Sequence, residues 1–476
     1  MSPVSERAAQ VRFRRALSLM AMTLIAPGSA QLVAGNRRIG TVAFRIWLGL
    51  LALGLATVVA LVADRGLALT LAFNTSLLLL VKLVLFALAI GWAALFVDAW
   101  RIGAPLSYGL RHRRASVAVN GLLCFGVAGT LLFGAHLVGV QRDLTLALSG
   151  SGGSSSAHDG RINVLLMGGD SGEGRWGLRP DSMNIASIDV ETGRTVLVAL
   201  PRNMAKFPFK EGSVMAEQFP QGFDCDGCYL NGVSTWAQDH TDLFPDSDNP
   251  GVDATIMGIE GITGLSINYW AMVNLQGFKD LVNAVGGVTL TVRQPIPVGG
   301  LGSDVTGYID PGTRKLDGFE TLWYARAREG SDDYSRMARQ KCVMSAMLSQ
   351  VSPQKVVTNF ASLAKASAAM ISTNIPAGDF DTLAELALKA RGQKISTLSL
   401  VPPMINTGDP DIDLVQSKVA EAIDRAEGNA PAAPAPKKKG KKQQPAGTTQ
   451  AVTGGSLGSL KEGYAANQAD DLGSSC

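Results

Sequence analysis

The sequence predicts an α/β protein: a three-layer αβα sandwich domain preceded by an all-α transmembrane region. The chain has 476 residues, which is too long for one ordinary domain. Its long apolar runs lie almost entirely before Val140, whereas the remainder has the composition of a soluble domain. In that remainder, strand-like segments alternate with helix-like segments, the pattern of an α/β fold. The net charge of +3 is small and indicates no partner by itself.

Three runs in the membrane region, 16–140, are long enough to cross a bilayer. They lie at 41–63, 74–97 and 117–139. Each holds about 20 mostly apolar residues, the length that the hydrocarbon core requires. An earlier apolar run at 16–34 is broken at Pro27-Gly28, and we expect a re-entrant hairpin there. The alternative for this run is a signal peptide, since it has a basic start and small residues near its end.

Arginines orient these runs, because basic loops stay on the cytoplasmic side. They cluster in 1–15, 35–45 and 98–116, whereas 64–73 holds only one Asp-Arg pair. We therefore predict a multi-pass protein of the cell membrane, with everything after the last span extracytoplasmic. The Gly- and Ser-rich segment 141–160 is expected to be a flexible tether to that outer part.

The outer domain is predicted to cover 161–427. Strands are expected at 161–167, 183–188, 195–199, 288–292, 322–328 and 395–401. Helices are expected at 278–285, 335–351, 355–371, 379–391 and 411–426. Asp332 or Asp333 is expected at the N-cap of the helix that begins near 335. An Ala-, Pro- and Lys-rich linker at 428–453 and a tail at 454–476 follow, and the linker is predicted to be disordered.

One motif in the outer domain imitates a dinucleotide site. Residues Gly172 to Gly177 match the spacing GxGxxG and follow a strand. A dinucleotide site requires a helix directly after the motif, but Pro180 and another strand follow here. The sequence therefore does not predict a nucleotide cofactor.

Arginines and aspartates gather at the predicted strand ends and in the loops after them. Arg326 and Arg328 are two apart on a predicted strand, and so would share a face. Guanidinium groups bind phosphate oxygens in pairs, and a helix N-terminus adds N–H donors. Asp170 and Asp181 could hold Mg²⁺, which takes few protein oxygens beside those of a phosphate. Each residue taken singly fits a surface ion pair equally well, and Asp333 fits an N-cap.

Several segments resemble one known family in the family's order, over about 160–350. They are INVLLMGGDSGEGRWGLRPDSM, LPRN, FKDLVNAVGGVTLTV, LDGFETLWYARAR and SDDYSRMARQKC. They resemble the LytR-CpsA-Psr family of wall-polymer ligases, and the long insertion, the cysteines and the several spans resemble its actinobacterial members. The resemblance implies an α/β sandwich with a hydrophobic tunnel for a polyprenyl chain. It also implies a Mg²⁺-dependent phosphotransferase that moves a glycan from polyprenyl pyrophosphate to a peptidoglycan hydroxyl.

The resemblance also assigns residues to roles. Its catalytic positions are Asp170, Asp181 and Arg326, and its metal ligands are Asp170 and Asp181. The pyrophosphate positions are Arg179, Arg202, Arg326, Arg328, Asp333, Arg336, Arg339 and Gln340. Two departures stand out, because Gly172 and Asn203 occupy places where the family often has Arg and Asp. Since Asn203 cannot act as a base, Asp170 or Asp181 would have to bind metal or activate the acceptor, and catalysis could be weakened.

The chain has five cysteines, and the four that lie outside the apolar runs are an even set that fits a compartment where disulfides form. Cys124 lies in an apolar run and is expected to be an inert thiol. Four cysteines permit three pairings, and our hypothesis is Cys225–Cys228 with Cys342–Cys476. The alternative for the CxxC pair is half of a zinc site, but no second CxxC exists and His240 is poorly spaced.

Two other functions use the same features. With water as the acceptor, the site would be a polyprenyl pyrophosphate phosphatase. The domain could instead be a non-enzymatic membrane-bound regulator of envelope genes, since some family members are described as transcriptional attenuators. The expected partners are the lipid-linked glycan, peptidoglycan and the lipid bilayer, with no nucleic acid, because the folded domain is predicted to lie outside. The sequence does not identify the polymer.

Overall fold

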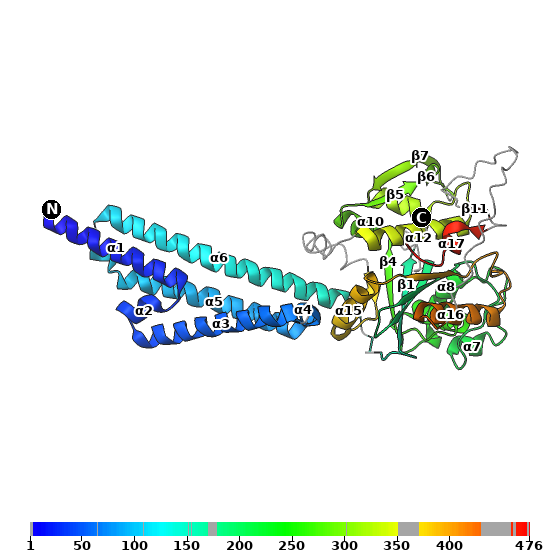
Figure 1. Cartoon of the computed structure of the whole chain (residues 1–476), viewed down its shortest axis with the longest axis horizontal. Helices are drawn as coiled ribbons and strands as arrows, with labels where there is room; N and C mark the ends of the chain where they lie inside the picture. Colours follow the sequence, from blue (N-terminus) through cyan, green and yellow to red (C-terminus); the bar gives the residue numbers. More distant parts are fainter. Residues whose placement is uncertain are drawn as a thin grey trace. The chain divides into compact units, whose positions relative to one another are not determined.

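The computed structural model describes residues 3–63, 65–107, 109–150, 152–153, 155–169, 179–300, 302–350, 371–429, 458–459, 463–473 and 476. The chain divides into two compact units, Met1–Leu146 and Ala147–Cys476. Figure 1 shows the first unit, in blue to cyan, as helices and the second as strands with helices around them.

The first unit is built from apolar helices. They are α1 (Pro3–Ile25), α2 (Ser29–Ala34), α3 (Arg37–Ala63), α4 (Arg65–Phe73), α5 (Thr75–Ile102) and α6 (Leu110–Leu148). Three stretches among the described residues are long and apolar enough to cross a membrane: Arg37–Ala63, Thr75–Ser107 and Leu110–Leu146. They contain the predicted spans at 41–63 and 117–139 and all of the span at 74–97 except Asn74, which caps α5. A loop was predicted at 64–73, and this is wrong, because the helix α4 occupies Arg65–Phe73.

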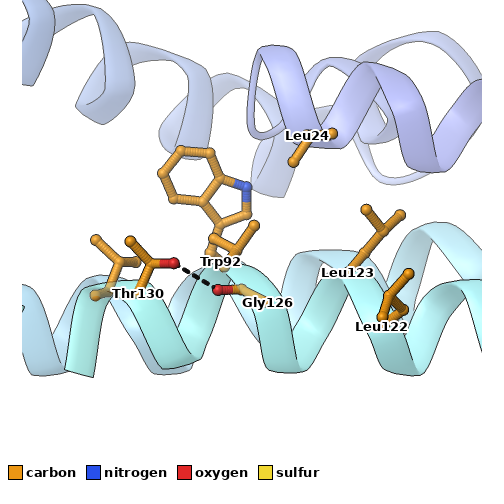
Figure 2. Close-up of a pocket in the computed structure, with 8 residues that line it drawn as sticks. Leu24, Trp92, Leu122, Leu123, Gly126 and Thr130 are labelled. Carbon is orange, nitrogen blue, oxygen red and sulfur yellow. Dashed lines mark hydrogen bonds between the residues drawn. The ribbon is translucent and has the colours of Figure 1, made fainter. Parts of the chain in front are cut away.

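A tight turn separates α1 from α2, where the sequence predicted the hairpin to bend. Gly28 has a φ of +92°, and a Cβ there would lie 2.6 Å from the carbonyl oxygen of Gly40 in α3. Only glycine fits this close approach. Trp92 of α5 donates from Nε1 to the carbonyl of Thr23 in α1 at 3.0 Å. Figure 2 shows Trp92 beside Leu24 of α1 and the α6 residues around Gly126, where they line an apolar pocket of about 460 Å³.

A six-stranded mixed sheet forms the frame of the second unit, in the order β10-β3-β2-β1-β4-β9. Its strands are β1 (Arg161–Gly169), β2 (Pro180–Asp189), β3 (Thr195–Leu200), β4 (Tyr269–Asn274), β9 (Ile371–Thr373) and β10 (Ser396–Ser399). β1 is parallel to β4 and β3 to β10, while β2 is antiparallel to both of its neighbours. The predicted strands at 161–167, 183–188, 195–199 and 395–401 correspond to β1, β2, β3 and β10. β4 was not predicted.

Helices and ribbons surround this sheet (Figure 1). The helices are α7 (Val214–Gln218), α8 (Val233–Asp239), α9 (Pro250–Thr263), α10 (Leu275–Ala284), α11 (Gly318–Arg326), α12 (Asp333–Gln350), α15 (Phe380–Arg391), α16 (Ile412–Glu427) and α17 (Ala465–Gln468). Single 3-10 turns of this unit lie at Leu230–Gly232, Thr241–Leu243 and Ala377–Asp379, and the first unit has one at Pro105–Ser107. The two-stranded ribbons pair β5 (Val288–Val292) with β8 (Gly312–Leu316), β6 (Ile296–Gly299) with β7 (Val305–Ile309), and β11 (Gly458–Ser459) with β12 (Gly463–Tyr464).

The largest core lies against one face of the sheet. Leu165 and Met167 of β1 and Ile185 of β2 point into it, as their two-residue spacing requires. Helices α8, α9 and α16 supply its other side, with Ile259 and Val415 fully buried. A second core joins β5, β8, α11 and α12. The intervening residues of β1, β2 and β4 are left to face α10, α11 and α12.

The segment 322–328 is the main error in the predicted elements. The sequence alternates there, and a strand was predicted, but α11 ends at Arg326 and Arg328 lies in the following loop. The helix is favoured by a capping box: Asp317 accepts from the N–H of Glu320, and the Glu320 side chain accepts from the N–H of Asp317. Arg326 and Arg328 therefore do not share a strand face.

The predicted tether at 141–160 is also not free. α6 continues to Leu148, and Gly150 and Ser155 after it bond to residues at β4 and just past β9 (Ile371–Thr373). The N–H of Gly150 donates to the carbonyl of Ile375 at 2.8 Å, and that of Ser155 to the Tyr269 hydroxyl at 3.0 Å. The predicted helix at 355–371 and the linker at 428–453 fall almost wholly outside the described residues.

The structure has two disulfides, Cys225–Cys228 and Cys342–Cys476, the pairing of our hypothesis. A bonded CxxC pair has no thiolate left to bind zinc. Among the residues that the structure describes, no cluster of three or more His, Cys, Asp or Glu could hold a metal ion.

Candidate active site

A pocket of about 410 Å³ lies between the sheet and helices α10, α11 and α12. The strands contribute the residues that alternate with the core positions: Leu166 follows Leu165 in β1, and Asn184 lies between Met183 and Ile185 in β2. Most of its wall is apolar, as Phe278 of α10 and Leu322 of α11 illustrate. One end is charged and polar, and is lined by Asp181, Arg326, Arg336 and Gln340.

Helix α12 shows the same change along one face. Arg336, Gln340, Met344 and Met347 all line the pocket and follow the spacing of a single helix face. The face is charged near the helix N-terminus and apolar further along. A helix of this kind matches a ligand with an anionic head and a long apolar tail. The head would meet the charged end of the face, and the tail would meet the apolar end.

The charged end is held together by Arg202, which follows β3. Its Nη1 lies 2.5 Å from Asp181 Oδ1, and its Nε lies 2.9 Å from Asp333 Oδ2. Asp181 belongs to β2, and Asp333 begins α12. One guanidinium therefore joins the sheet to the helix beside the charged end of the pocket.

Asp333 is shared by three arginines. Besides Arg202, Arg328 approaches it at 3.3 Å and Arg336 at 3.6 Å. Burial alone would raise the pKa of Asp333, but the charges of Arg336 and Arg202 outweigh this and bring it below the ordinary value. The N-cap role falls to Asp332, whose Oδ1 accepts from the N–H of Ser335 at 2.8 Å.

Asp181 is likewise ionised at neutral pH. Burial would raise its pKa, but the charge and the hydrogen bond of Arg202 lower the pKa and outweigh burial. The pKa of Asp181 therefore lies below the ordinary value. Two carboxylates and three arginines (Arg202, Arg328 and Arg336) thus meet at one end of the pocket. Their formal charges leave one positive charge uncompensated within this cluster.

Arg336 is the member best placed to bind an anion. It is only 3% exposed, yet its Nε and Nη2 atoms have no hydrogen-bond acceptor among the described residues. The 3.6 Å approach to Asp333 is an ion pair but is too long for a hydrogen bond. Burial is the main cause that lowers the pKa of Arg336 to about 10, and it stays charged at neutral pH. Buried donors without acceptors are costly, and a phosphate oxygen would satisfy them.

Of the other predicted site residues, some line the pocket and some do not. Arg326 and Gln340 line the pocket, and the Arg326 guanidinium carbon lies 5.7 Å from the ring centroid of Trp323. Arg179 is exposed just before β2 and does not line the pocket. Asn203 faces Tyr334, with 3.5 Å between Nδ2 and the hydroxyl oxygen. Asp170 and Gly172 lie outside the described residues.

Arg339 serves the helix packing rather than the pocket. It is 1% exposed and lies on the α11 side of α12. Its Nε donates to the carbonyl of Tyr324 at 2.7 Å, its Nη1 to Ser335 Oγ at 3.0 Å and its Nη2 to the carbonyl of Ala327. These bonds fix the end of α11, and so the position of Arg326.

Replacing Arg339 by Met should therefore destabilise the protein. The substitution leaves two buried carbonyls without a donor, and we expect a loss of about 3 kcal/mol in the free energy of unfolding. Urea unfolding followed by tryptophan fluorescence would measure it. A change below about 0.5 kcal/mol would contradict the packing role, because such values are typical of surface sites.

The apolar wall of the pocket was not predicted residue by residue. One local signal existed: small or polar residues, Ser182 and Asn184, alternate with the apolar core positions of β2. Another was the apolar continuation of the α12 face at Met344 and Met347. The contribution of β4, through Ala271 and Val273, could not be seen because that strand was missed.

Several known proteins are similar to this chain in sequence. "Biofilm regulatory protein A" of Streptococcus mutans is 25% identical over 269 residues, 55% of this chain and 61% of that protein. The "polyisoprenyl-teichoic acid--peptidoglycan teichoic acid transferase TagU" of Oceanobacillus iheyensis is 27% identical over 200 residues, 41% of this chain and 53% of that protein. The "probable cell wall biosynthesis protein LcpB" of Corynebacterium glutamicum is 28% identical over 296 residues, 59% and 66% of the two chains.

The matches span between about half and two thirds of the length of these three curated relatives. Two solved structures are similar at lower identity. Protein gbs0355 from Streptococcus agalactiae has 22% identity and a TM-score of 0.42, and covers 57% of this chain and 89% of its own. TagV of B. subtilis has 22% identity and a TM-score of 0.40, and covers 58% of this chain and 100% of its own. The model of the LytR_cpsA_psr family matches residues 141–420, which is more than half of the sequence, and the chain belongs to this family.

Proposed function

We propose that the second unit transfers a glycopolymer from a polyprenyl pyrophosphate carrier to a hydroxyl of peptidoglycan. One observation carries the proposal: the apolar pocket ends at Arg336, a buried cation. Two of its donor atoms, Nε and Nη2, have no hydrogen-bond acceptor among the residues that the structure describes. A polyprenyl pyrophosphate has the matching shape, an apolar chain with an anionic head. The relative TagU, which is named as a teichoic acid transferase, supports the same reaction class.

The proposed reaction is a displacement at phosphorus. The acceptor oxygen forms a bond to the phosphorus that carries the glycan, and the bond from this phosphorus to the bridging oxygen breaks. Polyprenyl phosphate leaves with that bridging oxygen. The hydroxyl proton passes to a carboxylate, and our candidate is Asp181, which lines the pocket. Arg336 and Arg326 stabilise the charge that develops on the phosphate oxygens. Such fixed donors act without reorganisation during the reaction.

Mg²⁺ fits this arrangement as a partner of the substrate. Asp181 is an ionised carboxylate at the charged end of the pocket, and Mg²⁺ usually takes one or two carboxylates beside phosphate oxygens and water. Asp170, the second carboxylate proposed from the sequence, would complete such a set. When bound, the ion would supply further neutralisation of the pyrophosphate charge.

The pocket should select donors by the length of their lipid. Filling it with Met344→Trp removes space for the chain, and we expect KM for a long polyprenyl donor to rise about tenfold or more, since each buried methylene contributes about 0.8 kcal/mol. A short isoprenyl donor should be nearly unaffected. Transfer of labelled glycan to peptidoglycan, assayed with both donors, measures the difference.

A matched control is Leu388→Trp, which adds the same bulk on the exposed side of α15, away from the pocket. It should leave both donors within about twofold. An equal loss on both donors in Met344→Trp would argue against a lipid site. If water rather than peptidoglycan accepts the glycan in the unmodified protein, the activity is that of a phosphatase.

We further propose that the second unit is a three-layer αβα sandwich outside the cell membrane, anchored by a multi-pass first unit. The basic clusters and the three apolar helices support this arrangement. A reporter active only in the cytoplasm should be active when fused after Arg114 and silent when fused after Gly160. Cytoplasmic activity of the second fusion would overturn the topology and reopen a nucleic-acid partner.

A further inference from the structure

The residues 466–473 and 476, here called the 466–476 segment, lie beyond the part of the chain that the family model matches, yet are built into the second unit. Ala466 is fully buried in the core that contains α12, and Leu472 is 3% exposed. Ser396 of β10 forms a bridge with Asp471. The segment thus packs on the helix and on the sheet edge at once.

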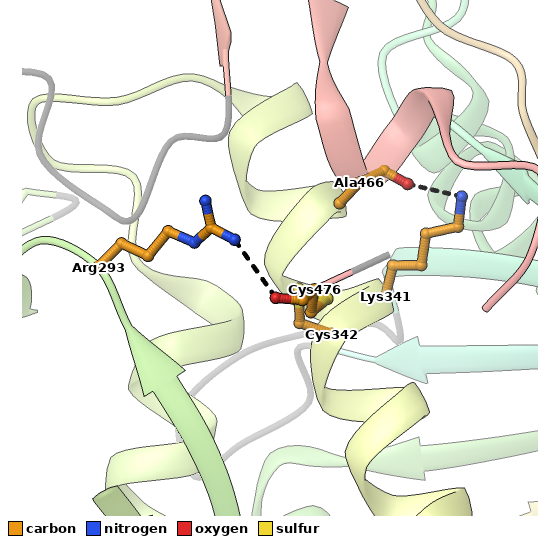
Figure 3. Close-up of a disulfide and its surroundings, with 5 residues drawn as sticks. All are labelled: Arg293, Lys341, Cys342, Ala466 and Cys476. Carbon is orange, nitrogen blue, oxygen red and sulfur yellow. Dashed lines mark hydrogen bonds between the residues drawn. A yellow bond between two sulfur atoms is a disulfide. The ribbon is translucent and has the colours of Figure 1, made fainter. Parts of the chain in front are cut away.

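Helix α12 holds one end of the segment. Lys341 Nζ donates to the carbonyl of Ala466 at 2.8 Å and lies 3.4 Å from that of Ala469. Asn467 Nδ2 donates to the carbonyl of Tyr334 at 2.9 Å. The next residue after Lys341, Cys342, is disulfide-bonded to Cys476. Figure 3 shows both attachments side by side on α12.

The sheet edge holds the same segment through backbone groups. The N–H of Thr397 donates to the carbonyl of Asp470 at 2.9 Å, and the N–H of Leu472 to that of Ile395 at 2.9 Å. Lys341 also reaches Ser399 of β10 at 3.4 Å. The segment therefore closes the seam between α12 and β10.

This seam borders the charged end of the pocket. Asp181 and Arg202 come from the sheet side, whereas Asp333, Arg336 and Gln340 come from α12. A small cavity in the seam is lined by Asp181 and Gln340 together with Lys341 and Ser399. A shift of α12 relative to the sheet would consequently separate the two halves of the site.

The ammonium of Lys341 adds a reason for the segment to stay in place. It is 5% exposed, and burial is the main cause that lowers its pKa to about 7, although Asp470 and Asp471 act in the opposite direction. The backbone carbonyls of the segment are its acceptors, and without them the buried amine would have to find water.

We propose that the 466–476 segment is a disulfide-locked latch that positions α12, and that reduction of Cys342–Cys476 loosens the active site. In the reduction, a thiolate of an external dithiol attacks one sulfur of the bond. The dithiol closes to its own disulfide and gives up two electrons, and Cys342 and Cys476 become thiols. The kinetic consequence rests on the proposed transfer function, whereas the movement of α12 does not.

The test uses the full chain in a bilayer or detergent, as the unmodified protein, as Cys476→Ser, and after treatment with dithiothreitol. We expect amide hydrogen exchange in α12 to rise about tenfold or more in the last two, and kcat/KM for the lipid-linked donor to fall about tenfold. Reoxidation of the treated protein should restore both. The double variant Cys225→Ser with Cys228→Ser should behave like the unmodified protein, because that disulfide does not touch α12.

Unchanged exchange in α12 after complete reduction, verified by alkylation of Cys342 and Cys476, would overturn the latch whatever the activity. Faster exchange with unchanged kcat/KM would likewise refute its positioning role. If the unmodified protein shows no transfer at all, the proposed function fails, and the binding of inorganic pyrophosphate replaces kcat/KM as the second measurement. A reduced protein must then bind pyrophosphate about tenfold more weakly for the proposal to stand.

Discussion

Arg336→Met should lower kcat for glycan transfer about 100-fold or more while leaving the fold at least as stable. Removing one donor aimed at developing negative charge typically costs about this much in rate. The stability expectation runs the other way, because Arg336 is a buried cation whose Nε and Nη2 meet no acceptor among the described residues. Without Arg336, Arg202 and Arg328 still face Asp181 and Asp333, so no charge in the cluster is left without a partner.

The matched control is Arg314→Met, since Arg314 lies on β8 with its side chain 44% exposed and pairs with the surface carboxylate Asp310 at 3.2 Å. It should change neither rate nor stability. Rates and unfolding free energies measured on the two variants and on Arg339→Met separate the roles. If Arg336→Met loses as much stability as Arg339→Met and retains turnover within about threefold, Arg336 is a structural residue.

The contrast between Arg336 and Arg339 shows where sequence reasoning stops. Both lie on the same helix, three residues apart, a spacing that brings two side chains to neighbouring positions on a helix surface. Within one turn of α12, one side chain can point to the pocket and another to α11. Packing decides that Arg336 lines the pocket and that Arg339 binds the carbonyls of α11. The local sequence does not distinguish them, because Arg339 is fixed by carbonyls of α11 and Arg336 lies near Asp181 of β2, two elements that come earlier in the chain.

Other parts of the fold could be predicted because their determinants are local. β1, β3 and β5 are short apolar or alternating runs bounded by turns, and all three were expected close to their observed limits. The strand predicted at 322–328 was wrong, because the capping box at Asp317, a signal present in the sequence, starts a helix instead. The apolar pocket is different in kind, since strands and helices far apart in the sequence create it together.

Asp333→Asn should destabilise the unliganded protein by about 2–3 kcal/mol at neutral pH. The substitution keeps the shape of the side chain but removes the carboxylate that Arg202, Arg328 and Arg336 share. Breaking such a pair leaves partly buried cations without compensation, and Asp181 alone cannot balance them. The control is Asp310→Asn, an exposed carboxylate 3.2 Å from Arg314, which should cost less than about 1 kcal/mol.

Acid and anions should each reduce this difference, for separate reasons. The folded-state pKa of Asp333 lies below its unfolded value of about 3.9, so its stabilising effect is present above that pH and is lost as the pH falls through the folded-state pKa. Asp333→Asn and the unmodified protein should accordingly converge in acid. At neutral pH, inorganic pyrophosphate should raise the unfolding midpoint of Asp333→Asn more than that of the unmodified protein. In the variant the anion meets three arginines that are balanced by one carboxylate instead of two. An equal rise in both proteins would mean that pyrophosphate does not bind at this cluster, and would remove the electrostatic basis of the proposed donor site.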